Sequence, residues 1–107
     1  MTEKCANDGG AAAMNYDAAA KVLQALAHPL RLRILEALHG GEKSCGELQE
    51  ALGCGQSMLS QQIKLLEQQG LVATRKVGTL KYCGIRNPEI LKLFTCMSKH
   101  VTDVLGK

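Results

Sequence analysis

The sequence predicts a mainly α-helical domain of five helices, with a two-stranded β-hairpin between the fourth and the fifth. Apolar residues recur at helical spacing in four separate stretches before residue 70 and in a fifth after residue 88. Capping residues and glycines separate those stretches. Between residues 71 and 86 the pattern changes to two short strands around Gly78 and Thr79.

The composition is that of a small single domain. The chain has 107 residues, and its only aromatic residues are two tyrosines and one phenylalanine, so its core is thin. Domains of this kind often complete their burial by dimerising. A net charge of +3 favours an anionic partner. No apolar run approaches the roughly 18 residues of a membrane span, so we expect a cytoplasmic protein with reduced thiols and no membrane contact.

An arm and two helices begin the chain. Residues 1–14 lack periodicity, so we expect a flexible arm ahead of one folded domain over residues 15–107. Asn15 or Asp17 can cap the first helix, over residues 16–28, and Pro29 suits the first position of the second, over residues 29–40. The residues expected to face inward are Val22, Leu23 and Leu26 in the first helix and Leu30, Ile34, Leu35 and Leu38 in the second.

A short helix, a turn and a longer helix follow in series. Ser44 and Glu47 form a capping box at the start of the short helix, and Gly53 ends it. After a turn of roughly four residues the next helix runs from Ser57 until Gly70 stops it. This order of elements is the helix-turn-helix layout.

The longer helix has an apolar and a polar face. Leu59, Ile63 and Leu66 have the i, i+4, i+7 spacing of a core-facing stripe. A polar face on an isolated helix is usually just solvated, but here a capped helix precedes it and a basic hairpin follows it. Hydroxyls, amides and a lysine can contact phosphates and base edges. We therefore interpret this face as DNA-contacting; its residues are Ser57, Ser60, Gln61, Lys64 and Gln68.

The hairpin and the last helix complete the domain. Residues 74–86 carry four basic residues and no acid. Asn87, Pro88 and Glu89 supply an N-cap, a first-turn proline and an acid near the positive helix end. The apolar stripe that follows is wider than one small core needs, which suggests a dimer seam. It comprises Ile90, Leu91, Leu93, Phe94, Met97, Val101, Val104 and Leu105.

The chain resembles the ArsR/SmtB family of bacterial winged helix-turn-helix repressors in three stretches, ALAHPLRLRIL, GEKSCGELQEALGCGQSMLSQQIKLLEQQGLV and TRKVGTLKY. The resemblance spans residues 23–94. It implies a homodimer, joined through the first and last helices, on a palindromic operator in double-stranded DNA, and release by a metal ion, a metalloid or a thiol-reactive signal. It also implies a recognition helix and a wing, with Gln62 standing where many members carry a histidine. The implied DNA-contacting residues are Ser57, Ser60, Gln61, Gln62 and Lys64 on the helix and Arg75, Lys76, Thr79 and Lys81 on the wing.

A thiol sensor is the first of several alternatives for the signal. The five cysteines include no Cys-x-x-Cys pair, which argues against a zinc ribbon or a thioredoxin-type centre. Cys45 lies in the first turn of a helix, where the helix dipole acidifies a thiol. Metalloid-sensing members carry two cysteines in this turn, at the places of Ser44 and Gly46. A soft ion such as As(III), Cd(II) or Zn(II), bound by Cys45 and Cys5, is the one cofactor suggested; otherwise Cys45 is a small buried apolar residue.

Oxidation or persulfidation is the close alternative to a soft ion. In the sulfide- and redox-responsive branch of the family, two cysteines form the sensing pair. In this chain the place of the first is occupied by Glu36, and the place of the second lies well downstream of Cys96. A different pair, such as Cys45 with Cys96, would have to be close in space. Cys54 precedes the recognition helix, so its modification would bring bulk towards DNA, whereas Cys83 is expected to pack in the core.

A zinc-type site on the last helix, shared by two antiparallel copies, would fall on Asn87, Glu89, His100 and Asp103. The simpler interpretation is that Asn87 and Glu89 cap the helix and that His100 and Asp103 face the solvent. A DNA-binding module without any effector also remains open. A thiol enzyme would need a cysteine beside a histidine base, and His28, His39 and His100 have no evident partner, so we expect no enzymatic activity.

Overall fold

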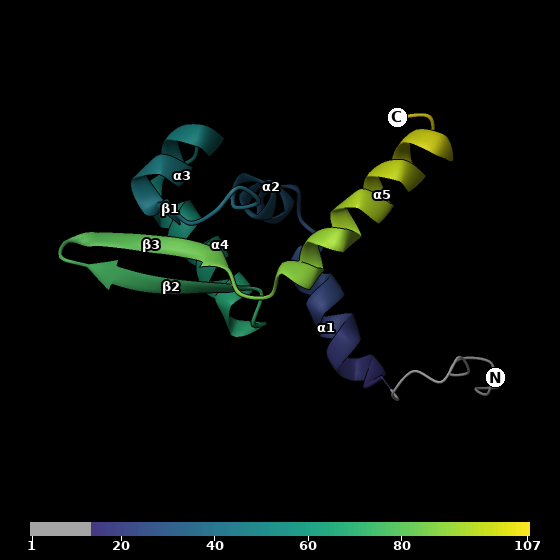
Figure 1. Cartoon of the computed structure of the whole chain (residues 1–107), viewed down its shortest axis with the longest axis horizontal. Helices are drawn as coiled ribbons and strands as arrows, with labels where there is room; N and C mark the ends of the chain where they lie inside the picture. The colour runs from purple at the N-terminus through teal and green to yellow at the C-terminus, as the bar shows by residue number, and fades with distance from the viewer. Residues whose placement is uncertain (1–13) are drawn as a thin grey trace.

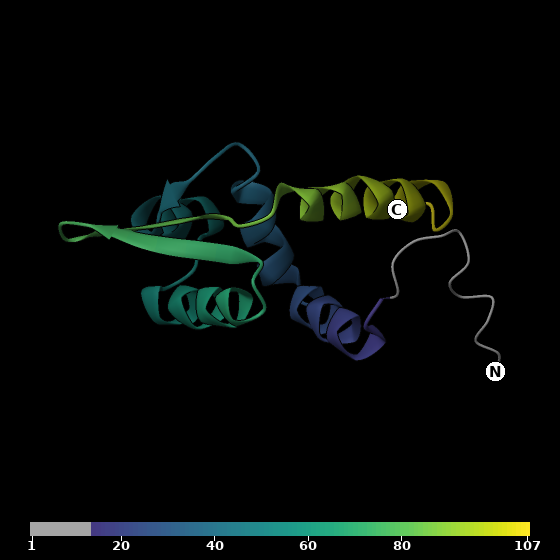
Figure 2. The same ribbon diagram turned by 60° about the horizontal axis from the view of Figure 1, so that its bottom comes forward.

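A computed structural model describes residues 14–107 of the chain. Its helices are α1 (Tyr16–Leu26), α2 (Pro29–Ala37), α3 (Cys45–Leu52), α4 (Gln56–Gln68) and α5 (Leu91–Asp103), and its strands are β1 (Lys43–Ser44), β2 (Val72–Val77) and β3 (Leu80–Ile85). The β2–β3 hairpin extends from one end of the domain, while α1 and α5 project from the other (Figures 1 and 2). Apart from Met14, the expected arm lies outside the described residues.

The predicted fold class is confirmed, with two additions. The strand β1 pairs antiparallel with β3 at Lys43↔Cys83 and Ser44↔Tyr82, so the hairpin belongs to a three-stranded sheet of order β1-β3-β2. A strand of two residues is too short to produce a periodic pattern, which is why the sequence did not predict it. The last helix also begins as a separate 3-10 turn, η2 (Pro88–Ile90). None of the helices in residues 14–107 has the length and apolar character needed to cross a bilayer.

The expected caps are present at the helix starts. Asn15 Oδ1 accepts a hydrogen bond from the Ala18 amide at 3.0 Å, so Asn15 rather than Asp17 caps α1. At α3, Ser44 Oγ accepts from the Glu47 amide at 3.1 Å, and Glu47 Oε1 accepts from the Ser44 amide at 2.8 Å. His28 Nδ1 accepts from the Leu30 amide at 3.1 Å, so this histidine caps α2.

The core lies where α2, α3, α4 and the inner face of the sheet meet. Leu23 was expected to face this core, and that expectation is wrong, since its side chain is 57% exposed. It lies seven residues, two helical turns, after the exposed Tyr16, so both occupy the outer face of α1. The fully buried residues include Ile34, Leu35, Leu48, Leu66 and Cys83.

The helix α5 packs against the domain only through its first turns. Leu93 and Phe94 are half-buried against the core, and η2 adds Ile90. No residue of α5 is fully buried. The later positions of the predicted stripe, Met97, Val101, Val104 and Leu105, are exposed. Half of the stripe therefore lacks a partner within residues 14–107.

We predict that Ser44→Ala lowers the free energy of unfolding by about 1 kcal/mol, because the capping box then loses an acceptor for a helix-end amide. Urea unfolding followed by circular dichroism measures the change. The matched control is Ser57→Ala, since Ser57 is exposed and makes no capping bond at the start of α4. Equal stability losses in the two variants would contradict a capping role for Ser44.

Candidate nucleic-acid interface

The two faces of α4 are separated as the spacing of apolar residues predicts. Leu59, Ile63 and Leu66 are at most 2% exposed and pack in the core. The polar residues Ser57, Ser60, Gln61, Lys64 and Gln68 are all exposed. The face predicted to contact DNA is therefore open to a partner.

Gln62 lies on the other side of the helix, which corrects the residue set implied by the resemblance. Its side chain is 8% exposed, and its Oε1 accepts a hydrogen bond of 2.7 Å from Arg31 Nε. Its Nε2 donates weakly to the sulfur of Met58 at 3.5 Å. Gln62 stands three residues after Leu59 and four before Leu66, so it belongs to the buried stripe. Its side chain therefore faces the core and not the exposed polar face of α4.

The first turn of α4 has no side-chain cap. The N-cap residue is Gly55, and no side chain accepts from the amides that follow it. The first amides of a helix have no acceptor within the helix, and they point along its axis with the positive end of the dipole. Such a terminus can bind a phosphate. Ser57, next to this terminus, adds an exposed hydroxyl group.

The wing has two faces of different electrostatic character. Thr74 and Cys83 are directly opposed in the β2–β3 register, and they face inward: Cys83 is buried, and Thr74 Oγ1 donates to Glu67 Oε2 of α4 at 2.9 Å. Lys76 and Lys81 are the opposed pair two residues nearer the tip, so they share this face. Like charges opposite one another destabilise a hairpin, and no carboxylate of residues 14–107 lies within ion-pair distance of either. An anion at this face would relieve the repulsion.

Arg75 lies on the opposite, outer face of the wing. Its Nε and Nη2 donate to the two oxygens of Glu42 at 2.9 and 2.8 Å, and its guanidinium lies 5.1 Å from the ring centroid of Tyr82. The hydrogen bond to Arg75 lowers the pKa of Glu42, so this carboxylate remains charged down to lower pH than usual. The predicted DNA contact Arg75 is therefore already paired, while Lys76 and Lys81 have no ion-pair partner among residues 14–107.

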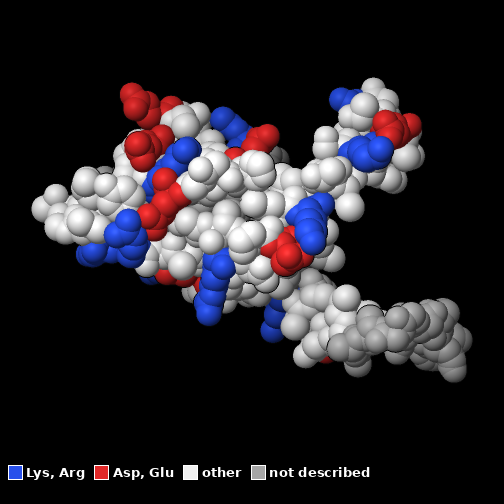
Figure 3. All heavy atoms as spheres, viewed as in Figure 1, with Lys and Arg blue, Asp and Glu red and all other residues white. Residues whose placement is uncertain are grey.

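The wing tip and the recognition helix enclose a shallow hollow. Its volume is about 220 Å³, and Cys45, Ser60, Thr79 and Lys81 are among the residues that line it. It lies where the starts of α3 and α4 meet the turn between β2 and β3. Figure 3 shows lysine and arginine side chains along the wing and the lower edge of the domain, whereas acidic side chains gather over α3. The hollow therefore brings together residues of α4 and of the wing that were predicted to contact DNA and one predicted sensor thiol.

The thiols occupy four different environments, while Cys5 lies outside the described residues. Cys45 is the first residue of α3 and is half-buried, as is Cys54. Cys96 is exposed on α5. Cys83 is fully buried, and burial raises its pKa to about 12, which confirms the expected packing role.

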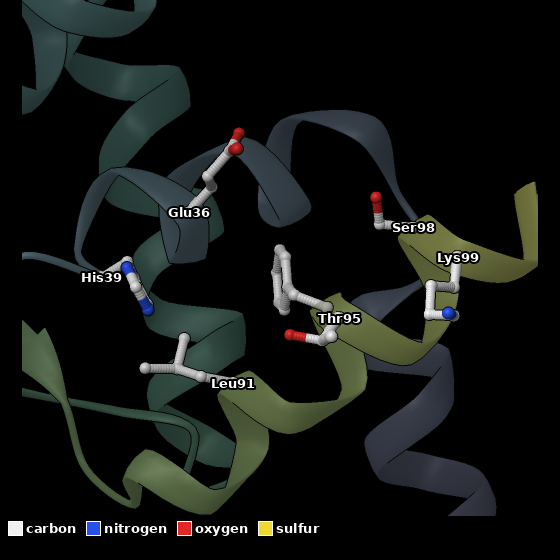
Figure 4. Close-up of a pocket in the computed structure, with 7 residues that line it drawn as sticks. Glu36, His39, Leu91, Thr95, Ser98 and Lys99 are labelled. Atoms are coloured by element: carbon white, nitrogen blue, oxygen red, sulfur yellow. The ribbon is translucent and has the colours of Figure 1, made fainter. Parts of the chain in front are cut away.

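The sensing pair of the redox-responsive branch is not reproduced. Glu36 occupies the first place, and it faces α5 across a hollow of about 390 Å³ that His39, Phe94, Thr95 and Ser98 also line (Figure 4). Cys96 does not line this hollow. The alternative pair of Cys45 and Cys96 is not brought together within one chain: Cys45 begins α3 and Cys96 lies in α5, and α2 lies between these two helices in both views (Figures 1 and 2).

The proposed zinc ligands are not gathered within one chain. Asn87 Oδ1 accepts from the Glu89 amide at 3.0 Å, and the Glu89 carboxylate pairs with Lys92 at 2.8 Å, so both residues serve the helix start. His100 and Asp103 lie near the other end of α5. Among residues 14–107, no three His, Cys, Asp or Glu side chains are placed to share a metal ion. A zinc site assembled from two copies stays a prediction.

Comparisons with known proteins agree with this geometry. Residues 26–75 match a family described as a helix-turn-helix domain. The chain is 38% identical over 92 residues to the HTH-type transcriptional regulator Rv0081 of Mycobacterium tuberculosis, covering 85% of this chain and 81% of that protein. The crystal structure of Rv0081 superposes with a TM-score of 0.77, covering 85% of this chain and 92% of that one.

Two further relatives carry more specific descriptions. One is a transcriptional repressor SmtB homolog of Synechocystis, 31% identical over 84 residues, which cover 78% of this chain and 64% of that protein. The other is a homodimeric winged helix-turn-helix DNA-binding domain from Mycobacterium bovis, described as a possible ArsR-family regulator and solved by NMR. It is 28% identical with a TM-score of 0.75, covering 90% of this chain and 95% of that chain. All of these relatives are described as regulators or DNA-binding domains rather than as enzymes.

We predict that iodoacetamide modifies Cys96 quickly in the folded protein and leaves Cys83 unmodified, because only the thiolate reacts and Cys83 is buried with a raised pKa. Mass spectrometry of tryptic peptides at successive times measures both. Denaturation provides the control, since Cys83 should then react as fast as Cys96. Equal rates in the folded protein would show that the β3 strand opens far more readily than its burial indicates.

Proposed function

Because the chain belongs to the ArsR/SmtB family of winged helix-turn-helix transcriptional regulators, we propose that it is a dimeric repressor that binds a palindromic operator and is released by a thiol-directed signal. The exposed face of α4 enters the major groove, and the inward face of the wing lies along the phosphate backbone. The observation that carries this assignment is the shared orientation of the unpaired lysines of the wing and the exposed polar residues around the uncapped start of α4.

The residues of this surface divide into readers and backbone contacts. Gln61 presents an amide that can pair with a base edge, and Ser57 and Ser60 are short enough to approach phosphates or bases. Lys64, Lys76 and Lys81 neutralise phosphates. Thr79 at the wing turn adds a hydroxyl contact beside Lys81. Gln62 is not included, because it is buried, and Arg75 contributes less, because Glu42 already neutralises it.

The dimer follows from apolar surface that one chain leaves exposed. On α1 this surface includes Tyr16, at 58% exposed, and Leu23, and on α5 it includes Met97, Val101 and Val104. Both helices project away from the wing, at the end of the domain opposite the DNA-contacting hairpin (Figure 2). The Mycobacterium bovis relative is described as a homodimer. A twofold axis through this seam would present two copies of α4 to two half-sites.

The proposed signal acts at Cys45. This thiol lies in the first turn of α3 and lines the hollow between the wing and α4, so a group attached there would stand between the two DNA-contacting elements. A signal that favours the DNA-free arrangement must weaken operator binding by the same factor. A soft ion such as As(III), Cd(II) or Zn(II) would need further ligands, such as Cys5 or residues of a second copy. Residues 14–107 alone do not supply such a ligand set.

Oxidation or persulfidation is the second candidate signal. The separation of Cys45 from Cys96 favours modification of a single thiol over a disulfide within one chain. Cys96 is the most exposed described thiol, and Cys54 lies just ahead of α4, so both are further targets. If modification of the thiols leaves the affinity for DNA unchanged, the protein is a constitutive DNA-binding module without an effector.

We predict that Lys64→Ala and Lys81→Ala each weaken DNA binding and flatten the plot of log K against log salt by about 0.9 for each phosphate that is no longer neutralised. Arg75→Ala should change this slope less, because Glu42 already compensates its charge. Fluorescence anisotropy of a labelled duplex at several salt concentrations measures the slopes. Lys92→Ala is the control, since Lys92 lies on α5 and pairs with Glu89. Unchanged slopes for Lys64 and Lys81 would remove both from the interface.

We also predict that DNA-bound reduced protein is released by a soft ion, a polysulfide or a peroxide, and that Cys45→Ser abolishes the response while leaving basal affinity intact. Anisotropy with the parent and each Cys→Ser variant separates the signals. Cys83→Ser is unsuitable as a control, because a buried thiol would be replaced by a hydroxyl group. Cys96→Ser, at an exposed position, is the comparison variant: it should respond like the parent if Cys45 is the sensor, and loss of its response would assign the signal to Cys96 instead. A Cys45→Ser protein that responds like its parent would exclude Cys45 as the sensor.

A further inference from the structure

Arg31 joins three helices through its guanidinium group. Its Nε donates to Gln62 Oε1 of α4 at 2.7 Å. Its Nη1 lies 3.3 and 3.2 Å from the carbonyl oxygens of Gln24 and Ala25 at the end of α1. These carbonyls are among the last four of α1, which the regular helix ladder leaves without a donor, and a cation there is favoured by the dipole. A residue of α2 thus connects the end of α1 to the middle of α4.

The bond to Gln62 constrains α4 within the orientation that its apolar stripe sets. Leu59, Ile63 and Leu66 direct one side of the helix to the core, and Gln62 lies among them. A buried amide is costly unless its oxygen is paired, and Arg31 Nε supplies the donor at 2.7 Å. A small rotation of α4 that the apolar side chains would tolerate breaks this directional bond. The bond therefore sharpens the rotation at which Gln61 and Lys64 face outward.

We infer that Arg31 and Gln62 are positioning residues for DNA readout: their hydrogen bond sharpens the rotation of α4 that the apolar stripe sets, and it ties the helix to the end of α1. Gln62 acts without touching DNA, and it holds Gln61 and Lys64 towards the groove. The exposed outer face of α1 belongs to the proposed dimer seam, so the bond also links the seam to the recognition helix. The inference rests on the proposed function, in which the outer face of α4 contacts the operator.

The decisive variants are Gln62→Glu and Gln62→Leu. Glutamate keeps an oxygen for Arg31, so we expect Gln62→Glu to bind a selected duplex within about twofold of the parent. If residue 62 contacted DNA directly, Gln62→Glu would instead place a carboxylate against the duplex, and the protein would lose affinity for it. Leucine fills the space but offers no acceptor, so Gln62→Leu should bind the selected duplex roughly tenfold more weakly, the effect of one charged hydrogen bond.

The probes are a duplex enriched by the parent protein from a random library and a scrambled duplex of the same composition. In Gln62→Leu only the enriched duplex should lose affinity, because phosphate contacts are retained. Thermal unfolding of the double variant Arg31→Met, Gln62→Leu supplies the readout of a merely structural role, since replacing both partners by apolar side chains leaves no unpaired group and should leave the melting temperature unchanged or raised. Arg31→Met should reproduce the loss, and the double variant should be no worse than either single one, as expected for one shared bond.

Two outcomes would overturn the inference: equal losses in Gln62→Glu and Gln62→Leu, or an unchanged ratio of enriched to scrambled affinity in Gln62→Leu. Parallel losses on both duplexes with a lowered melting temperature would likewise assign Arg31 and Gln62 to folding alone. Each of these is distinct from failure of the proposed function, in which the parent itself would retain no duplex at low salt.

Discussion

The packing of α4 against the core is the constraint on which the rest of the molecule depends. Leu59, Ile63 and Leu66 bury one side of a helix that is otherwise polar, and burial of three large apolar side chains strongly favours that orientation. The polar residues of α4 are then exposed because the apolar residues occupy the buried side of the helix. The wing is placed on the same basis, because Thr74 ties β2 to α4 and the buried Cys83 anchors β3 in the core, which leaves the lysines farther out on the same face.

The two faces of the wing show why net charge alone is a weak guide to a nucleic-acid surface. Four basic residues lie between positions 74 and 86, yet they are not equivalent. Arg75 is paired twice with Glu42 and covers Tyr82, so its charge is compensated and its side chain is fixed. Lys76 and Lys81 repel each other across the ladder, and a polyanion is the natural partner that turns this repulsion into attraction.

The distribution of thiols limits the forms that a signal can take. Cys83 is protected by burial, and Cys96 lies far from Cys45 in the same chain. Cys45 is the thiol that combines a helix-start position with a place beside the DNA-contacting surface. This arrangement suits a modification whose effect is local, because the wing and α4 would be separated at the point where both meet DNA. The hollow between α2 and α5, by contrast, contains a carboxylate and an imidazole rather than thiols (Figure 4).

The sequence by itself determined the order of the helices, the capping box at Ser44 and Glu47, the hairpin, and the apolar stripe of α4, because these depend on spacing and on neighbours within a few residues. The first two helices were predicted to end at residues 28 and 40, and they end earlier, at Leu26 and Ala37. The strand β1, the outward position of Leu23, the Glu42–Arg75 pair and the burial of Gln62 were decided only in the tertiary structure. Each depends on a partner far away in sequence: Arg31 is 31 residues from Gln62, and Glu42 is 33 from Arg75. Gln62 falls on the apolar stripe of α4 by its spacing, but only the structure shows the Arg31 donor that allows an amide to be buried there.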